Sequence, residues 1–402
     1  MVKSDQYDAI ILGAGGAGLM CALTAGQGGK RVLVIDHASG PGKKILISGG
    51  GRCNFTNVNA TSANAQERYL SANPHFAKSA LGRYTPSNFI DLVADYGIAF
   101  HEKTLGQLFC DGSARQIVEM LMAECDKSIA SGGDVDFAFH APISDVRHTD
   151  GRFIVTYNGL TASAPALVVA TGGPSIPKMG ATGFAYDLAR QFGLKVVEPR
   201  PALVPFTLGG DDILFRELSG VSADVVARCG KIRFREAALL THKGLSGPAI
   251  LQISSYWRHG EPVGINFLPD QPQGWLRQCK RDKPRSTIKS VLASSLSGRL
   301  ADILADRIGE QSNLADLQDR RLEEAEHLLS DWPFLPNGTE GYAKAEVTLG
   351  GISTDGLSQK SMEAKTVPGL FCIGEAVDVT GWLGGYNFQW AWASGVAAGS
   401  EL

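Results

Sequence analysis

Asp8-Ala-Ile-Ile-Leu-Gly-Ala-Gly-Gly-Ala-Gly18 is the stretch that decides the fold of this chain. Its apolar run, residues 9–12, predicts a buried parallel strand, and the small residues 17–27 predict the helix that follows the Gly-x-Gly-x-x-Gly turn. A second apolar run, Val32-Leu-Val-Ile35, ends on Asp36. A strand, a glycine turn, a helix and an acid in this order are typical of a dinucleotide-binding unit.

The three glycines of this turn have different predicted roles. Gly13 permits the tight turn, Gly15 lets the backbone approach a pyrophosphate, and Gly18 lets the helix pack against the strand. Unpaired N–H groups at the start of the helix would bind that pyrophosphate, and Asp36 would accept hydrogen bonds from a ribose hydroxyl. The alternative is a glycine-rich turn without a ligand, which the flanking strand, helix and acid disfavour.

Composition sets the class of protein and the partners to expect. The 402 residues have the apolar and charged fractions of a soluble globular protein, and the length predicts two or three domains. A formal net charge of −3 gives no electrostatic support for binding to nucleic acid or to an anionic membrane, so neither partner is expected. Residues 1–5 lack the apolar core of a signal peptide, which predicts a cytoplasmic location.

The seven cysteines do not form a recognisable pattern. Their number is odd and no two are spaced as Cys-x-x-Cys, so we expect no disulfide framework, no zinc ribbon, no bound metal and no redox-active dithiol. Cys53 stands out because it lies in a glycine-rich loop, Gly40-Pro-Gly-Lys-Lys-Ile-Leu-Ile-Ser-Gly-Gly-Gly-Arg-Cys-Asn54. A buried structural thiol is the favoured interpretation for it, and a functional thiol is the alternative.

The same loop has features of a ligand-binding backbone. Three consecutive glycines, residues 49–51, are unfavourable inside a helix or a strand and suit a loop that lies flat against a ligand. Ser48, Arg52 and Asn54 would supply hydrogen-bond donors. Lys44 would face either a phosphate or solvent.

The middle of the chain contains one further strand-to-glycine turn. The apolar residues 166–170 run into Thr171-Gly-Gly173, but Pro174 and Pro177 follow where a helix would have to start. This is therefore not a second dinucleotide fingerprint, and a separate nicotinamide domain of the usual kind is not predicted. A proline-rich linker at 198–205 then leads into a β-rich inserted unit with a helical appendage, residues 199 to about 342.

The last sixty residues have the same pattern as the first forty, with a strand, a glycine turn and a helix of small residues. A strand ends in Gly374-Glu375, and the glycine-led turn Gly384-Gly-Tyr-Asn387 begins a helix of small residues. Together with the opening fingerprint, this is an arrangement for FAD, in which Glu375 or Asp378 binds the ribityl hydroxyls. Backbone N–H groups of the glycine turn, with the helix dipole behind them, would approach the N1/O2 edge of the flavin ring.

Four stretches spread over the chain resemble the YhiN/BaiN-type NAD(P)/FAD-dependent oxidoreductases, which include aminoacetone oxidase. They are residues 13–18, Gly42-Lys-Lys-Ile-Leu-Ile-Ser-Gly-Gly-Gly-Arg-Cys-Asn-Phe-Thr-Asn57, Thr241-His-Lys-Gly-Leu-Ser-Gly-Pro248, and Gly374-Glu-Ala-Val-Asp378 with Gly384-Gly-Tyr-Asn-Phe-Gln-Trp-Ala-Trp392. The resemblance implies an α/β fold, a Rossmann-like two-dinucleotide-binding FAD domain with an inserted β-barrel-like and helical domain. The implied boundaries are 1–198 with 343–402 for the FAD domain, 199–275 with 331–342 for the β-barrel-like insert, and 276–330 for its helical part.

The resemblance also implies where the cofactor binds. We expect it to be held without a covalent bond, because Cys53 is the only thiol in a loop next to the flavin and His37 and His75 lie in no motif for linkage. The expected contacts are Gly13, Gly15, Gly16, Ala17, Gly18, Asp36, His37, Lys44, Ser48, Gly49, Gly50, Arg52, Cys53, Asn54, Thr171, Gly172, Gly374, Glu375, Asp378, Gly384, Gly385, Tyr386 and Asn387. Leu108-Phe-Cys-Asp111 stands where a Phe-Pro pair would be expected in the family, so the loop there is expected to differ.

These residues predict an FAD-dependent oxidoreductase that moves a hydride through flavin N5 to or from a small organic substrate, with NAD(P)H as a transient electron donor. The alternatives are a flavin amine-type oxidase that uses oxygen and a flavin-binding sensor without turnover. A flavoprotein acting on RNA is disfavoured because no basic patch is apparent. His242 and Ser246 would face the substrate, although a histidine satisfied by backbone hydrogen bonds is the simpler interpretation. No catalytic acid or base is assigned.

Overall fold

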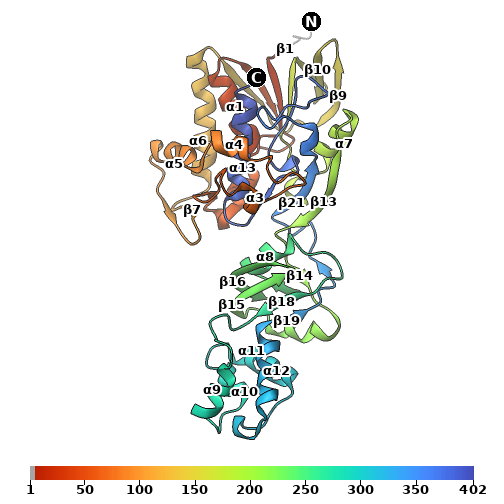
Figure 1. Ribbon diagram of the computed structural model, residues 1–402. Coiled ribbons are helices and arrows are strands. Elements are labelled where there is room, and N and C mark those ends of the chain that lie inside the picture. Colours follow the sequence, from red (N-terminus) through yellow and green to blue (C-terminus); the bar gives the residue numbers. More distant parts are fainter. Residues whose placement is uncertain (1–4) are drawn as a thin grey trace. The chain divides into compact units, whose positions relative to one another are not determined.

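The structure of the protein is a computed structural model that describes residues 5–402, with side chains from Tyr7 onward. The chain divides into two compact units, residues 1–200 with 347–402 and residues 201–346. The first unit is therefore made of two separate segments, and the second unit is an insertion between them (Figure 1).

A five-stranded parallel sheet forms the centre of the first unit. Its strands, in spatial order, are β22 (Leu370–Cys372), β12 (Ala166–Val169), β2 (Ala9–Leu12), β3 (Arg31–Ile35) and β8 (Asp134–Ala138). All residues of β2, β12 and β22 are buried, as expected for parallel strands covered on both faces. The predicted α/β class with a Rossmann-like core is confirmed.

The first and last helices of the chain pack tightly on each other beside this sheet. They are α1 (Gly16–Gln27) and α13 (Tyr386–Gly399) (Figure 1). A Cβ atom on Gly395 would lie 2.7 Å from the Ala17 carbonyl oxygen, and one on Gly399 would lie 2.7 Å from that of Cys21. The two backbones therefore approach as closely as they do because these positions carry no side chain, and the approach brings the C-terminal loop to the opening glycine turn.

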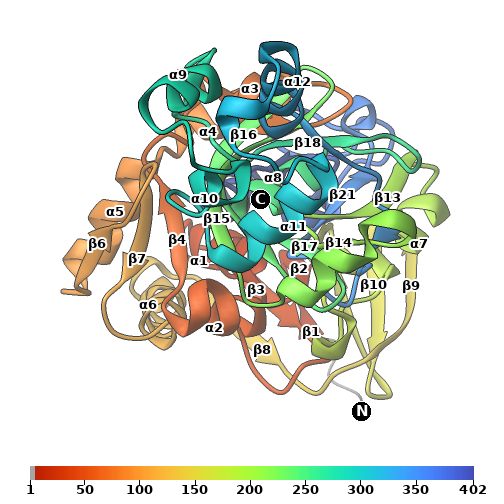
Figure 2. The same ribbon diagram turned by 90° about the horizontal axis from the view of Figure 1, so that it is seen from below.

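Smaller elements surround the parallel sheet. An antiparallel group is formed by β4 (Asn54–Asn57), β7 (Gln107–Cys110) and β6 (Phe100–Glu102), and another by β9 (Ile143–Thr149), β10 (Arg152–Tyr157) and β11 (Leu160–Ala164), which pairs with β1 (Asp5–Gln6) (Figure 2). Short pairs join β5 (Tyr69–Leu70) to β23 (Thr380–Gly381) and β13 (Val196–Ala202) to β21 (Val347–Ile352). The remaining helices are α2 (Lys43–Ile47), α3 (Ala65–Arg68), α4 (Lys78–Arg83), α5 (Pro86–Asp95), α6 (Arg115–Asp126) and α7 (Phe184–Gln191).

One local expectation differs from the structure. The proline-rich stretch expected to be a linker begins inside β13, which pairs with β21 as a two-stranded ribbon. Prolines are tolerated in such a ribbon because each strand has one edge that needs no hydrogen-bond donor.

The second unit is built on a seven-stranded sheet. The strands, in spatial order, are β19 (Trp332–Phe334), β18 (Val263–Asn266), β15 (Ser222–Cys229), β16 (Ile232–Leu240), β17 (Gly244–Ser246), β14 (Phe206–Thr207) and β20 (Gly338–Thr339). Helix α8 (Pro248–Ser254) packs on β16, and the other helices are α9 (Trp275–Asp282), α10 (Ile288–Leu292), α11 (Gly298–Ile308) and α12 (Asp319–Ser330). Edge-to-face contacts of Phe215 with Trp332 and Phe334 fill its core.

Candidate cofactor site

The glycines of the opening turn differ in how closely their surroundings pack. A Cβ atom on Gly13, which has φ +106°, would lie 2.5 Å from the Ala170 carbonyl oxygen, and one on Gly18 would overlap the Gly13 carbonyl oxygen. Gly16 faces the Trp392 ring, 2.8 Å from such an atom. Gly15 has an ordinary φ of −79° and nothing within 4 Å of its Cβ position. Gly15 is therefore the position that leaves open space at the start of α1.

Asp36 lies at the end of β3 and is already tied to the turn. Its carboxylate accepts hydrogen bonds from the N–H groups of Ala14 (2.7 Å) and Ala38 (2.8 Å). The side chain keeps 15% exposure, and the exposed His37 ring lies 3.6 Å away. Asp36 thus braces two loops and still presents part of its carboxylate toward solvent.

Two buried hydroxyls flank the glycine turn that follows β12. Neither Thr171 Oγ1 nor Thr348 Oγ1 has a hydrogen-bond partner in the described part of the chain. A Cβ atom on Gly173 would lie 2.6 Å from Thr348 Oγ1, so both hydroxyls are close to this turn. Gly172 has φ +73° and open space at its Cβ position. Buried hydroxyls without partners are costly, and a polar ligand at this turn would relieve that cost.

A charged cluster joins four segments that are far apart in sequence. The Lys44 ammonium contacts Glu375 Oε2 at 2.5 Å and donates to Ser175 Oγ at 2.7 Å. Ser175 and the Thr348 N–H group both donate to Glu375 Oε1, at 2.7 and 2.9 Å. Lys44 is therefore held against Glu375 rather than extended alone into solvent.

The two acids considered for the ribityl chain differ in access. Asp378 is 2% exposed, accepts a hydrogen bond from the Ala72 N–H group at 2.8 Å, and has its pKa raised by burial. Glu375 keeps 21% side-chain exposure. Of the two carboxylates, only that of Glu375 is accessible from outside the core.

The loop 48–54 contains exposed and buried positions. Gly49 and Gly50 have left-handed φ values of +56° and +67° and are exposed, as is Arg52. Ser48 follows the last residue of α2, and its Oγ donates a hydrogen bond to the Ile45 carbonyl at 2.7 Å. Cys53 is fully buried, and burial raises the pKa of its thiol to about 12. The structural interpretation of Cys53 therefore holds, because a thiol in this state is neither ionised nor exposed.

The C-terminal loop is braced against β4, which differs in part from the expected approach to a flavin ring. Gly385, with φ +94°, packs so closely on Thr56 that a Cβ atom would overlap the Thr56 backbone. With the Asn54 amide turned to satisfy its neighbours, its oxygen accepts the Gly385 N–H group at 3.2 Å. Asn387 bonds to both backbone groups of Gly381, at 2.8 and 2.9 Å. The side chains here support the loop rather than point outward.

Tyr386 and the glycines around it complete the description of this loop. Tyr386 is buried and stacks edge to face with Tyr69, whose hydroxyl donates to the Tyr386 carbonyl at 3.0 Å. A Cβ atom on Gly384 would lie 2.7 Å from the Gln107 side chain. Gly374 in turn has φ +64° and lies against the Ala17 methyl group, so the loop between β22 and α13 meets the start of α1.

The residues expected to face the substrate lie in the second unit. His242 is in the exposed turn between β16 and β17, where its carbonyl accepts a hydrogen bond from Arg216 Nε at 2.9 Å. Ser246 ends β17. The substrate-facing role of both stays a prediction.

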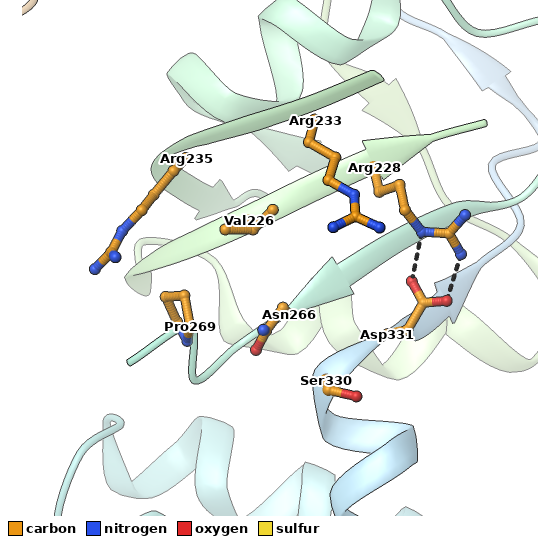
Figure 3. Close-up of a pocket in the computed structure, with 8 residues that line it drawn as sticks. All are labelled: Val226, Arg228, Arg233, Arg235, Asn266, Pro269, Ser330 and Asp331. Carbon is orange, nitrogen blue, oxygen red and sulfur yellow. Dashed lines mark hydrogen bonds and ion pairs between the residues drawn. The ribbon is translucent and has the colours of Figure 1, made fainter. Parts of the chain in front are cut away.

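A cationic pocket lies on the sheet of the second unit, and the sequence interpretation missed it. The pocket has a volume of about 420 Å³ and is lined by Val226, Arg228, Arg233, Arg235, Asn266, Pro269, Ser330 and Asp331 (Figure 3). The sequence signal was the placing of Arg233 and Arg235 two residues apart on one strand, which puts both on the same face.

In residues 5–402 no helix is long and apolar enough to cross a bilayer.

Several known proteins are similar to this chain in sequence or in fold. The family model described as HI0933-like protein Rossmann domain matches residues 7–401. The chain is 50% identical to the "Ribosomal RNA dihydrouridine synthase" of Escherichia coli, over 99% of this chain and 98% of that one, and 46% identical to the protein of the same name from Haemophilus influenzae, over 99% of each. A solved 3-ketosteroid delta1-dehydrogenase of Sterolibacterium denitrificans, in complex with 1,4-androstadiene-3,17-dione, superimposes with a TM-score of 0.54 at 13% identity, over 98% of this chain and 99% of that one.

The family match confirms the resemblance to YhiN/BaiN-type flavoproteins, and the structural likeness shows the fold alone. Two expectations are wrong. Both relatives are named for ribosomal RNA, which contradicts the expected small organic substrate and the expected absence of a nucleic-acid partner. The error came from using the net charge of −3, because a net charge averages over surfaces that a long ligand meets one at a time.

Proposed function

Since the chain belongs to the HI0933-like Rossmann-domain family of flavoproteins, we propose that it is an FAD-dependent enzyme that reduces uridine to dihydrouridine in ribosomal RNA. One observation carries the proposal, namely 50% identity to a ribosomal RNA dihydrouridine synthase over nearly the full length of both chains. The aligned region covers 99% of this chain, so both units have counterparts in that relative, which supports the proposal.

The residues of the first unit fit FAD. The N–H groups at the start of α1 and the open position at Gly15 would hold the pyrophosphate. The exposed part of the Asp36 carboxylate would accept a hydrogen bond from a hydroxyl group of the adenosine ribose. The unpartnered Thr171 hydroxyl and the accessible Glu375 carboxylate would bond to the rest of the cofactor. Attachment would be non-covalent, because Cys53 is buried and protonated.

The chemistry divides between the cofactor and the chain. FAD, when bound and reduced, would supply a hydride equivalent to the substrate. The uracil ring gains that hydride and a proton across its C5–C6 double bond, so each dihydrouridine consumes two electrons. Reduced nicotinamide, NADH or NADPH, is the donor class we propose for those electrons, bound transiently because no second dinucleotide fingerprint is present. A ribosomal RNA substrate would place the protein in the cytoplasm.

Mass spectrometry of digested ribosomal RNA tests this proposal. RNA from an Escherichia coli strain deleted for the 50%-identical relative would be incubated with the holoprotein and NADPH or NADH. We expect at least one uridine to gain two hydrogens, and none to do so without the reductant or with protein stripped of FAD. A holoprotein whose flavin is reduced but that leaves every uridine unchanged would contradict the proposal.

A further inference from the structure

We propose that the pocket on the sheet of the second unit binds phosphates of the RNA backbone, through Arg233 above all. The inference rests on the proposed function, which makes RNA the substrate. It adds the surface that holds the RNA, on a unit that contributes none of the residues assigned to FAD. The pocket lies entirely within residues 201–346, across β16, β15 and β18 (Figure 3).

The strand register gathers the arginines on one face. Arg233 on β16 is directly opposite Arg228 on β15, and Arg235 is opposite Val226. Val226 is in turn opposite Asn266 on β18. Directly opposed and alternate residues share a face of a sheet, so three guanidinium groups and an amide line one surface.

Arg228 is fixed in place by an acid that the fold positions for it. Its guanidinium makes a two-point contact with the Asp331 carboxylate (Figure 3). Gly264 lies beneath this pair, and a Cβ atom there would overlap Asp331 Oδ1. The fold thus positions this ion pair, and the Asp331 carboxylate neutralises the charge of Arg228.

Arg235 is held by weaker ion pairs than Arg228. It contacts Asp224 at 3.0 Å and Asp270 at 2.7 Å, but the two acids are 58% and 77% exposed. Exposed ion pairs contribute little to stability, so a phosphate can replace a carboxylate here at little cost. The hydrogen bonds that Arg235 donates to Asp270 and Asp224 raise the pKa of its guanidinium, which remains charged throughout.

Arg233 is the uncompensated charge of the pocket. No acid among residues 7–402 forms an ion pair or hydrogen bond with it, although it is exposed on the sheet between the two paired arginines. Arg228 and Arg235 have carboxylate partners, so Arg233 carries the positive charge of the pocket that no acid among residues 7–402 offsets. An anion at this position would offset that charge, and a guanidinium binds phosphate by two parallel hydrogen bonds.

The lining favours a nucleic-acid backbone over a free nucleotide. None of the eight lining residues is aromatic, so the pocket offers no platform on which a base could stack. Arginine, asparagine and serine side chains bind phosphate and sugar, which position a nucleic acid without reading its sequence. The pocket would therefore hold the RNA, and the selection of a uridine would occur elsewhere.

Salt-dependent binding of three variants tests the inference. The probe is protein-free ribosomal RNA from the Escherichia coli strain deleted for the relative, and the holoproteins are Arg233→Glu, Arg233→Lys and, as matched control, Arg299→Glu. Arg299 is also exposed on the second unit and does not line the pocket. We expect Arg233→Glu to bind about tenfold or more weakly at moderate salt and to lower the slope of log affinity against log salt by about one. Arg233→Lys should keep most of the slope, and Arg299→Glu should match the wild type.

Flavin content and thermal midpoints of all proteins would show that the comparison is between folded holoproteins. Unchanged affinity and slope for folded Arg233→Glu would overturn the inference, and so would an equal loss in Arg299→Glu. Dihydrouridine formation separates this from the proposed function. If the wild type modifies the RNA and Arg233→Glu does so equally well at every salt concentration, the function stands and the phosphate site fails. If the wild type forms no dihydrouridine, the proposed function itself fails.

Discussion

At the scale of single residues, the glycines show what a motif can and cannot predict. The spacing of Gly13, Gly15 and Gly18 predicted three separate roles. The close contacts at Gly13 and Gly18 agree with a turn and with helix packing, and the role of Gly15 at a pyrophosphate stays a prediction. The sequence could not distinguish Glu375 from Asp378, because their difference is one of burial by distant segments. It also could not place Lys44, whose partners Ser175 and Glu375 come from other parts of the chain.

Gly15→Ala and Gly18→Ala should therefore fail in different ways. Gly15 has open space and an ordinary φ, so its alanine variant should keep the stability of the apoprotein and bind FAD at least about tenfold more weakly, or about 1.4 kcal/mol. Gly18→Ala would push a methyl group into the Gly13 carbonyl and should lose about 1–3 kcal/mol of folding stability. Gly298→Ala, at another open position, is the control. Melting curves and flavin titrations measure both quantities, and equal behaviour of Gly15→Ala and Gly298→Ala would refute the assignment.

Gly385→Val tests whether the C-terminal loop tunes the flavin or only supports it. Because Gly385 touches the Thr56 backbone and its N–H group bonds to Asn54, we expect the variant to lose stability and bound FAD. The holoprotein that survives should keep the midpoint potential of the wild type. A redox titration of retained flavin gives the answer, and a clear fall in potential would show that the backbone at Gly385 stabilises the reduced ring directly.

At the scale of elements, periodicity predicted individual strands and helices but not their contacts. The apolar runs at 9–12, 32–35 and 166–170 form neighbouring parallel strands, as buried runs of that length should. The packing of α13 on α1 depends on Gly395 and Gly399, which read in the sequence only as a helix of small residues. The run 198–205 contains the boundary between the two units, and its first residues also belong to the ribbon of β13 and β21, where proline is tolerated.

Glu124 on α6 links three elements and predicts a pH dependence. Its carboxylate accepts hydrogen bonds from Lys127 (2.6 Å), Gln27 of α1 (2.8 Å) and Tyr96 (2.8 Å). Burial alone would raise its pKa, but these three hydrogen bonds outweigh burial and hold the pKa below its ordinary value of 4.5. The carboxylate therefore stabilises the fold above pH 4.5, and this contribution is lost as the pH falls through the lower pKa of the folded state.

Glu124→Gln should accordingly be less stable than the wild type at pH 7, by about 1–3 kcal/mol. The deficit should shrink as the pH falls below about 4.5, because the wild type then becomes protonated as well. Denaturant unfolding at pH 7 and at acidic pH measures the difference. Glu119→Gln, at an exposed position of the same helix, should show no deficit at either pH. A deficit of Glu124→Gln that grows in acid would contradict the sign of the pKa shift.

At the scale of the whole molecule, the sequence predicted the fold and the family and misjudged the substrate. The residues expected to bind the cofactor lie in short contiguous motifs, so residues 8–36 predicted a dinucleotide-binding unit and, together with residues 374–387, an arrangement for FAD. The cations of the second unit are instead assembled by strand pairing, with Arg228 and Arg233 brought opposite each other across β15 and β16. A chain with a net charge of −3 can hold such a local surface, which composition does not reveal.

The central claim is that ribosomal RNA accepts the electrons carried by this flavoprotein. Anaerobic mixing of the pre-reduced holoprotein with RNA from the deletion strain tests it most directly, because the return of oxidised flavin absorbance reports the transfer itself. We predict rapid reoxidation with one dihydrouridine formed for each flavin, and no reoxidation by RNA whose uridine is already reduced. Reoxidation that is equally fast with modified and unmodified RNA, or that leaves no dihydrouridine behind, would contradict the account.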